Sequence, residues 1–300
     1  LVTGVQTCAL PIYINVVDVD ADTFNIDVLS LENNIKHIIA EGILTPKAIV
    51  AVDLYGLPAN YPALRHIADT YGLYILEDSA QGFGGRINGK LDCSFGDIAT
   101  TSFFPAKPLG CYGDGGALFT DNDEWAALAD SYRVHGKGAF KYDNVRIGMN
   151  SRLDTMQAAI LQVKFKAFRE VELDAVNKAA DEYTFRLHDI VKTPVIPEGF
   201  RSSWAQYTIT FPSKQQRDDV QAVLKEQGIP SMIYYPTPMH GQTVYKDVKD
   251  RVNDCPVAQQ LCQTVLSLPM HPYINVEDID MVCNAIKDCL KVGINRTHLK

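Results

Sequence analysis

The first half of the chain alternates between short apolar runs and longer stretches in which apolar residues recur every three or four positions. The short runs are bounded by turn-forming residues and predict strands. They cover residues 13–20, 47–56, 73–78, 97–104 and 115–120. Because strands that alternate with helices along a chain usually pair in parallel, the pattern predicts an α/β fold with a mostly parallel, doubly wound sheet.

The helices between these strands carry recognisable end signals. We expect one helix over 30–42, capped by Ser30, and a second from its N-cap at Asn60 to Gly72. A third is expected over 122–136. Each lies between two expected strands or follows one, as a doubly wound fold requires.

The second half of the chain is organised differently. Residues 151–190 keep a helical period throughout, which is typical of a long helix that spans two domains. After the proline-rich segment 193–199 we expect strands over 204–211 and 230–235, a helix over 215–228 and helices near Cys255 and Glu277. The sequence therefore predicts a large domain, 13–191, and a smaller C-terminal α/β domain, 192–300.

Composition narrows the function classes. The 300 residues are 46% hydrophobic and carry a net charge of −8, with no run rich in Lys and Arg. A basic footprint for nucleic acid is missing, and no apolar run approaches the roughly 18 residues of a membrane span. The seven cysteines form no CxxC pair, and the histidines show no metal-ligand spacing. We expect a soluble, cytoplasmic protein with reduced thiols, no metal, and no nucleic-acid or membrane partner.

Residues 1–12, LVTGVQTCALPI, fit neither a helix, nor a strand, nor a secretory signal. Translated back into DNA, residues 2–12 resemble a widely used sequencing adapter read in frame. We expect this segment to be an artefact and the natural chain to begin upstream. A divergent N-terminal arm is the alternative.

Polar residues follow two of the expected strands. Asp78 ends the strand 73–78, at the carboxyl edge where parallel sheets bind ligands. Asp78 and Gln81 also fit a helix-capping pair, and on these residues alone the structural interpretation is favoured. Ser102 is open to the same two interpretations, since it can simply end a strand.

The segment TSFFPAKPLGCYGDGG gives a stronger chemical signal. Lys107 follows an aromatic strand, lies between two prolines that stiffen the backbone, and precedes four glycines. In an apolar pocket its amine can lose a proton and act as a nucleophile. The glycines fit neither GxGxxG nor a Walker loop, so they favour tight turns over dinucleotide or triphosphate binding.

These motifs belong to an ordered set. In order and spacing, this set resembles the motifs of the DegT-type nucleotide-sugar aminotransferases, which use pyridoxal 5'-phosphate (PLP). Its members are EDSAQGFGG, TSFFPAKPLGCYGDGGALFT, VHG, GMNSRLDTMQAAIL, YYPTPMH and SLPMHPY. The resemblance runs from about Tyr13 to the final helix and implies the PLP-dependent transferase fold type I and a homodimer with shared active sites. KPLGCYGDGGA, NSRLDT and LSLPMHPY resemble in particular the UDP-hexuluronate 3-aminotransferases of that family.

The resemblance implies a role for each polar residue. Lys107 would bond the cofactor covalently and move a proton during amino transfer. Asp78 would pair with the pyridine nitrogen, and Gln81 would contact the phenolic oxygen. Ser102 would bind the phosphate, which Asn150 would reach from the opposite subunit.

Four further residues are candidates for substrate binding. Arg152 would suit a diphosphate or carboxylate of the substrate, with an ion pair on the helix surface as the equal alternative. Tyr234, Tyr235 and His240 fall where the small domain of this family closes over the sugar. Buried, hydrogen-bonded tyrosines are the competing interpretation.

The implied reaction is amino transfer from L-glutamate to a keto group on a nucleotide-linked sugar, with UDP expected, for surface polysaccharide or glycan synthesis. The alternatives are another keto-sugar, such as a 4-keto-6-deoxy type, a dehydratase of the same family, and a silent PLP-binding regulator. Lys107 argues against the dehydratase, in which this lysine is replaced. Compared with the family, the chain lacks a Gly-Thr phosphate-binding segment and a ring-stacking residue, so we expect weak cofactor binding and little turnover from it.

Overall fold

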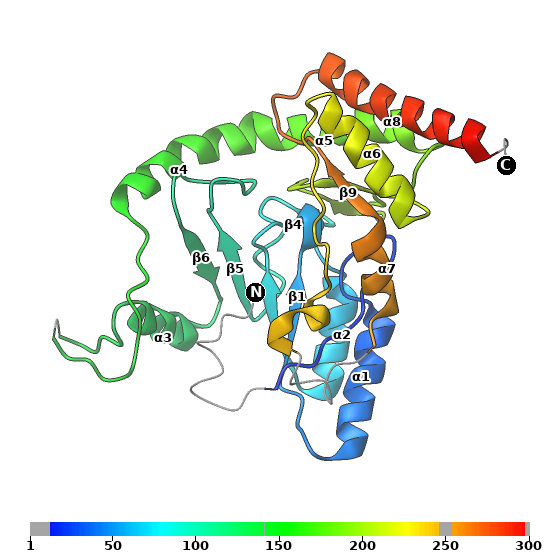
Figure 1. The fold of residues 1–300 in the computed structure, drawn as a ribbon. Coiled ribbons are helices and arrows are strands. Elements are labelled where there is room, and N and C mark those ends of the chain that lie inside the picture. The colour runs from blue at the N-terminus through cyan, green and yellow to red at the C-terminus, as the bar shows by residue number, and fades with distance from the viewer. Residues whose placement is uncertain (1–12, 141, 246–253, 298–300) are drawn as a thin grey trace.

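The structure is a computed structural model that describes residues 13–140, 142–245 and 254–297 (Figure 1). The segment 1–12, expected to be an artefact, lies outside the described residues.

Four strands form the central sheet, in the order β1 (Ala48–Val52), β2 (Tyr74–Asp78), β5 (Ile98–Ser102) and β6 (Gly116–Phe119). The first three run parallel, and β6 pairs antiparallel with β5. The register places Asp78 opposite both Val52 and Thr100. The expected α/β fold with a mostly parallel, mixed sheet is confirmed, and the carboxyl ends of the parallel strands meet at one edge.

Two helices, α1 (Val28–Glu41) and α2 (Tyr61–Tyr71), pack against one face of this sheet (Figure 1). Strand side chains alternate between faces, so Ile49, Ala51 and Ile75 point into this core together. The ends of α2 are those expected, with the Asn60 side chain as its N-cap and Gly72 in a left-handed conformation.

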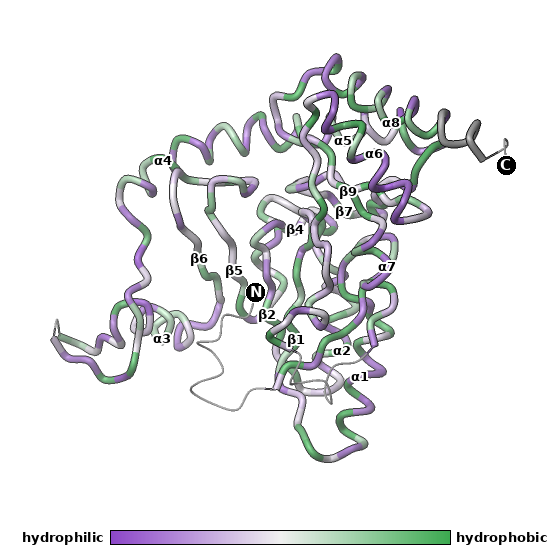
Figure 2. Tube along the Cα trace, in the orientation of Figure 1, coloured by the Kyte–Doolittle hydropathy of each residue, from purple (hydrophilic) through white to green (hydrophobic). Residues whose placement is uncertain are grey.

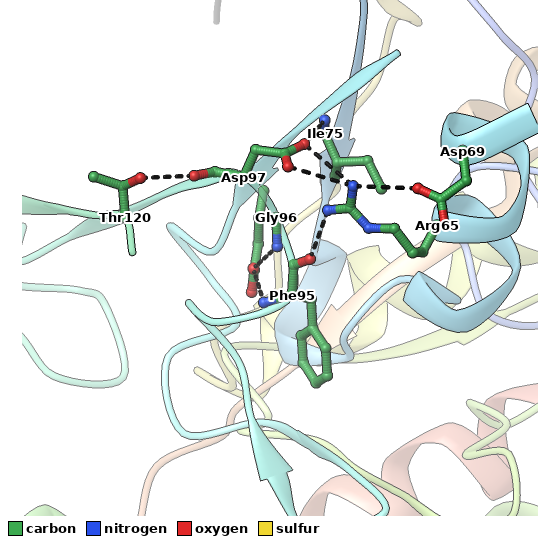
Figure 3. Close-up of polar contacts among 8 residues, drawn as sticks. Arg65, Asp69, Ile75, Phe95, Gly96, Asp97 and Thr120 are labelled. Atoms are coloured by element: carbon green, nitrogen blue, oxygen red, sulfur yellow. Dashed lines mark hydrogen bonds and ion pairs between the residues drawn. The ribbon is translucent and has the colours of Figure 1, made fainter. Parts of the chain in front are cut away.

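Arg65 of α2 ties that helix to the sheet (Figure 3). Its guanidinium lies 3.3 Å from Asp97 Oδ2 and 3.2 Å from the carbonyl oxygen of Phe95. Asp97 Oδ2 also accepts a 2.6 Å hydrogen bond from the Ile75 amide, and its carbonyl accepts one of 2.9 Å from Thr120 Oγ1. The loop that leads into β5 is therefore fixed to α2 and to both neighbouring strands.

A long continuous helix joins the two halves of the chain (Figure 1). It consists of α4 (Thr155–Ala167), a π-helical segment (Phe168–Glu172) and α5 (Leu173–Leu187). It starts after the expected residue 151 because Asp154 caps it, accepting a 2.8 Å hydrogen bond from the Met156 amide. A shorter helix, α3 (Asp123–Arg133), lies between β6 and α4 in the sequence.

The C-terminal part packs on α5. Its elements are β8 (Tyr207–Thr210), α6 (Lys214–Glu226), α7 (Pro256–Thr264), β9 (Val265–Leu268) and α8 (Val276–Thr297). Hydrophobic and hydrophilic residues alternate along α8 (Figure 2), whose buried face packs on α5 and α6. A small antiparallel sheet of β3 (Arg86–Ile87), β4 (Lys90–Leu91) and β7 (Phe200–Arg201) connects this part to the first half. The domain boundary near residue 192 stays a prediction.

Three local expectations are wrong. Residues 13–20 form no strand, because only Val19 pairs, in a single bridge to Ile26. The cap of α1 is Asp27 instead of Ser30, whose amide donates to the Asp27 side chain at 2.5 Å. Residues 230–235 form no strand either, since the prolines around them limit pairing to one bridge at Met232.

Two further observations concern the described residues as a set. None of their helices is long and apolar enough to cross a membrane. Their six cysteines are all free thiols, and Cys8 lies outside the described ranges.

Candidate active site

Asp78 is the last residue of β2, at the edge where the three parallel strands end. Its Oδ1 accepts a 3.1 Å hydrogen bond from the Ala80 amide, and the chain then forms a turn over residues 79–84. No helix follows β2 here, so the capping-pair interpretation of Asp78 and Gln81 is wrong. The sheet itself holds Asp78 in place.

Lys107 lies in a tight loop after β5. Its amide donates to the carbonyl oxygen of Phe104 at 2.8 Å, and the Phe104 amide donates to Ser102 Oγ at 3.2 Å. Gly110 lets the loop close, because a Cβ there would lie 2.6 Å from the carbonyl oxygen of Pro105. Ser102 and Lys107 are therefore parts of one folded loop, as the glycines in the sequence suggested.

The Lys107 amine is half-buried, and two opposing effects act on its pKa. Loss of contact with water lowers the pKa below the usual range of lysine, and the negative charge of Asp78 opposes this. A lysine with a lowered pKa has more of its amine in the neutral, nucleophilic form at neutral pH. The charge of Asp78 thus reaches the Lys107 amine, as the roles implied by the resemblance would require.

Gln81 connects this edge to the C-terminal part of the chain. Its buried side chain accepts a 2.7 Å hydrogen bond at Oε1 from the Tyr55 amide, and its Nε2 donates to the Tyr235 hydroxyl at 3.4 Å. Its backbone carbonyl accepts from Ser203 Oγ at 2.8 Å. Both the oxygen and the nitrogen of the side-chain amide are therefore hydrogen-bonded, which fixes the orientation of the side chain.

Tyr55 is a site residue that sequence reasoning missed. It follows β1 in a turn, with φ at 60°, and its buried hydroxyl donates to the carbonyl oxygen of Tyr234. Burial raises the pKa of this hydroxyl well above its usual range, which keeps it in its donor form. Its position near the end of the expected strand 47–56, where parallel sheets bind ligands, was the available signal.

Of the candidate substrate residues in the C-terminal part, the two tyrosines contact the residues of this edge and His240 does not. Tyr234 and Tyr235 reach the group of Tyr55 and Gln81 through the contacts above. His240 lies in a short 3₁₀ turn, where its Nε2 is 3.1 Å from Gln259 Nε2 of α7. No contact within the described ranges joins His240 to Lys107 or Asp78.

Asn150 and Arg152 lie on the segment between α3 and α4, and both are exposed. The Asn150 backbone bridges to Val134, and within the described ranges its side chain makes no hydrogen bond. Arg152 forms no ion pair with any described residue, so its pairing with a neighbour on the helix surface is not observed. Within the part of the chain that the structure describes, no hydrogen bond or ion pair joins either side chain to Lys107.

Residues 5–287 match the DegT/DnrJ/EryC1/StrS aminotransferase family. The chain belongs to this family. A Pseudomonas aeruginosa protein, UDP-2-acetamido-2-deoxy-3-oxo-D-glucuronate aminotransferase, is 42% identical to this family member over 281 residues, which are 93% of this chain and 73% of the relative.

Two solved structures give the same fold. A DegT DnrJ EryC1 StrS aminotransferase from Brucella abortus is 48% identical, with a TM-score of 0.86 over 91% of this chain and 72% of its own. A Bacillus subtilis protein with bound cofactor PMP, the amine form of PLP, is 28% identical, with a TM-score of 0.81 over 94% and 63% of the two chains. The family member is thus a PLP-dependent sugar aminotransferase, as the motifs predicted.

The site residues of this aminotransferase fit PLP chemically. A half-buried lysine offers a nucleophilic amine, a carboxylate lies close enough to influence its charge, and a hydroxyl and an amide stand on the adjoining turns. When bound, PLP supplies an electron sink for the substrate carbon. Among the described residues, no group of three or more His, Cys, Asp or Glu side chains is placed to hold a metal ion.

Proposed function

We propose that this aminotransferase transfers the amino group of L-glutamate to the 3-keto carbon of a UDP-linked amino-sugar uronate, for glycan synthesis. The proposal is supported by a half-buried Lys107 whose pKa is lowered by burial and which feels the charge of Asp78, the last residue of β2. The substrate class follows the Pseudomonas aeruginosa relative, whose name specifies a 3-oxo-D-glucuronate attached to UDP.

Each residue then has a defined task. Lys107 would hold PLP through its Nζ, and that amine, once freed, would take a proton from the amino-bearing carbon of the donor and, in the other half of the reaction, deliver one to the sugar carbon that receives the amino group. Asp78 would keep the pyridine nitrogen of PLP protonated by its negative charge. Gln81 would orient the phenolic oxygen, and Ser102 would bind the phosphate.

The substrate residues come from outside this core. Tyr235 lies against Gln81 and Tyr234 against Tyr55, and both tyrosines would contact the sugar, with His240 on the same side. The exposure of Asn150 and Arg152, and their lack of contact with Lys107, suit residues that serve the partner's site in a homodimer. There Asn150 would reach the phosphate, and the Arg152 guanidinium would pair with the diphosphate or the uronate carboxylate.

The first test concerns Lys107. After incubation with PLP and reduction with borohydride, mass spectrometry of wild-type protein is expected to find the pyridoxyl group on the Lys107 peptide. Lys107→Ala should carry none there and should lose amino transfer entirely, whereas substitution of an exposed lysine such as Lys214→Ala should change neither. Attachment at another lysine with Lys107 unmodified would overturn the proposal.

The second test concerns the substrates. With ¹⁵N-labelled L-glutamate, the label should appear on carbon 3 of the UDP-linked 3-keto uronate. A UDP-linked 3-keto sugar without the carboxylate and a 4-keto-6-deoxy sugar should react more slowly. If the 4-keto-6-deoxy sugar reacts fastest, the alternative substrate class is correct. Normal cofactor attachment without transfer to any of the three would favour the silent regulator.

A further inference from the structure

Three buried carboxyl groups surround one hydroxyl directly behind the edge of the site. Ser79, the residue after Asp78, places its Oγ 2.5 Å from Asp53 Oδ2, 3.0 Å from Asp92 Oδ2 and 3.2 Å from Glu77 Oε1. Asp53, Glu77 and Ser79 are fully buried, and Asp92 is 6% exposed. No cation accompanies this concentration of negative charge among the described residues.

Apart from their contacts with Ser79, the three carboxyl groups accept hydrogen bonds from other groups. Glu77 accepts three, from the backbone amides of Cys93, Phe95 and Gly96, at 2.5, 2.7 and 2.9 Å. Figure 3 shows the Phe95 and Gly96 amides in the loop that Arg65 also holds. These three amides suit a carboxylate that accepts only, because each of them supplies a hydrogen.

Asp53 and Asp92 differ from Glu77 in having one oxygen each without an amide donor. Asp53 Oδ1 accepts from the Ala59 amide and the Tyr61 hydroxyl, at 2.9 and 2.8 Å. Asp92 Oδ1 accepts from the Gly84 amide at 3.0 Å. Their Oδ2 atoms both face Ser79 Oγ.

A serine hydroxyl has one hydrogen to donate and two lone pairs to accept with. It can therefore satisfy one of the two Oδ2 atoms as a donor, and the other contact needs a hydrogen on the carboxyl side. Both Oδ2 atoms also lie close to Gly82. A Cβ added there would be 2.8 Å from Asp53 Oδ2 and 2.9 Å from Asp92 Oδ2. Two ionised carboxylates so placed would repel each other without a hydrogen between them.

Electrostatics agrees with this hydrogen count. Burial, followed by the charge of Glu77, raises the pKa of Asp53 to about 8. Burial, followed by the charge of Asp53, raises the pKa of Asp92 to about 8. The pKa of the nearby Cys93 thiol is raised too, by burial first and then by Asp92, so the thiol stays neutral and adds no further negative charge.

We propose that Asp53 and Asp92 hold one proton between them beside Ser79, and that these three are positioning residues for the turn 79–84. That turn follows Asp78 directly and carries Gln81. It contacts the proton-sharing pair twice, through the Ser79 hydroxyl at its start and through the close approach of Gly82 at its middle. The inference rests on the proposed function only for the cofactor roles of Asp78 and Gln81.

The proton itself is measurable through folding. In the unfolded chain both aspartates are ionised at pH 6, so folding takes up the shared proton there. We expect Asp53→Asn to fold with about one proton less uptake than wild type, measured from the pH dependence of urea unfolding between pH 5 and 7. The asparagine amide supplies the missing hydrogen while its oxygen still serves Ala59 and Tyr61. A difference of zero protons would overturn the proposal.

Asp92→Asn is the independent second variant, since its oxygen can still accept from Gly84. It should give the same loss of one proton, and it decides the question if Asp53→Asn does not fold. Asp69→Asn, an exposed aspartate 3.9 Å from Arg65, is the matched control and should keep the wild-type proton uptake. A control change equal to that of the buried variants would also contradict the shared proton.

The positioning role needs a separate readout. Amide hydrogen exchange of residues 79–84 can be measured by mass spectrometry without cofactor. Between pH 7 and pH 9 the wild type should lose the shared proton, so exchange there should speed up by more than the intrinsic effect of pH. Asp53→Asn should keep its protection, whereas Asp53→Ala should be unprotected at both values. Equal pH responses of wild type and Asp53→Asn would refute positioning. Failure of cofactor attachment at Lys107 would refute the proposed function and leave these results unaffected.

Discussion

The backbone amide of Tyr55 donates a 2.7 Å hydrogen bond to Gln81 Oε1, and so joins the turns that follow two neighbouring parallel strands. Each of the two residues also contacts the C-terminal part of the chain, Gln81 at the Tyr235 hydroxyl and Tyr55 at the carbonyl oxygen of Tyr234. The cofactor edge and the segment proposed to contact the sugar are therefore held together by two side chains.

Tyr55→Phe should separate these two functions. The substitution removes the hydrogen bond to Tyr234 and leaves the backbone amide that holds Gln81. A neutral hydrogen bond contributes about 1 kcal/mol, which corresponds to roughly fivefold in binding. We expect KM for the nucleotide sugar to rise by about that factor, with little change in the PLP dissociation constant measured by absorbance.

The matched control is Tyr74→Phe, which removes a hydroxyl from a tyrosine that is 56% exposed on β2. It should leave both constants unchanged. If Tyr55→Phe weakened PLP and the sugar equally, the hydroxyl would be supporting the whole edge instead of the sugar segment.

The sequence was sufficient for the parts of the fold and site that depend on local pattern. Strand and helix alternation gave the sheet, and the position of Asp78 at a strand end follows directly from it. Lys107 was predicted as a site residue because a lysine between two prolines and before four glycines is not typical of a solvated surface charge. Local signals failed at residues 13–20 and 230–235, where partners distant in the sequence decide whether a strand pairs.

Tyr55 and the carboxyl group of Asp53 were not identified because their importance comes from contacts with distant residues. The Tyr55 hydroxyl meets a residue 179 positions away, and Asp53 meets Ser79 across two strands. A tyrosine and an aspartate after an apolar strand are ordinary turn residues until the register of β1 against β2 is known.

Asp78→Asn should shift the reactivity of Lys107 toward lower pH. Burial already lowers the pKa of the Lys107 amine, and the Asp78 charge opposes this, so its removal lets the pKa fall further. Competitive acylation of the cofactor-free protein, read by mass spectrometry of the Lys107 peptide across pH 6 to 11, measures the midpoint. Asp114→Asn, an exposed aspartate in the same glycine-rich loop, should leave it in place. A midpoint that rises in Asp78→Asn would contradict the arrangement.

Gly110→Ala should disorganise the lysine loop. Its new Cβ would lie 2.6 Å from the Pro105 carbonyl oxygen and 2.7 Å from that of Phe104, both backbone atoms that cannot rotate away. We expect a loss of about 1–3 kcal/mol in unfolding free energy and weaker pyridoxyl attachment at Lys107. Gly113→Ala is the matched control, since its nearest neighbour would be 3.5 Å away in the Gln157 side chain. Equal losses of unfolding free energy in Gly110→Ala and Gly113→Ala would show that the entropy of the loop determines the destabilisation. The close approach of Gly110 to the Pro105 carbonyl oxygen would then not be its cause.

Glu77→Gln should destabilise the fold, because the buried carboxylate accepts only from backbone amides of one loop and from Ser79. Both carboxylate oxygens of Glu77 accept from amides of the loop 93–96, so an amide group must point its own N–H₂ at one or two of these donors. The least costly orientation points the N–H₂ at the Cys93 amide and leaves one buried donor unpaired, so we expect a loss of about 1–3 kcal/mol in urea unfolding. Glu32→Gln changes the same atoms at an exposed pair with Lys36 and should cost much less. A comparable loss in both would mean that the loop tolerates the missing acceptor, and that Glu77 does not fix the chain between Asp92 and β5.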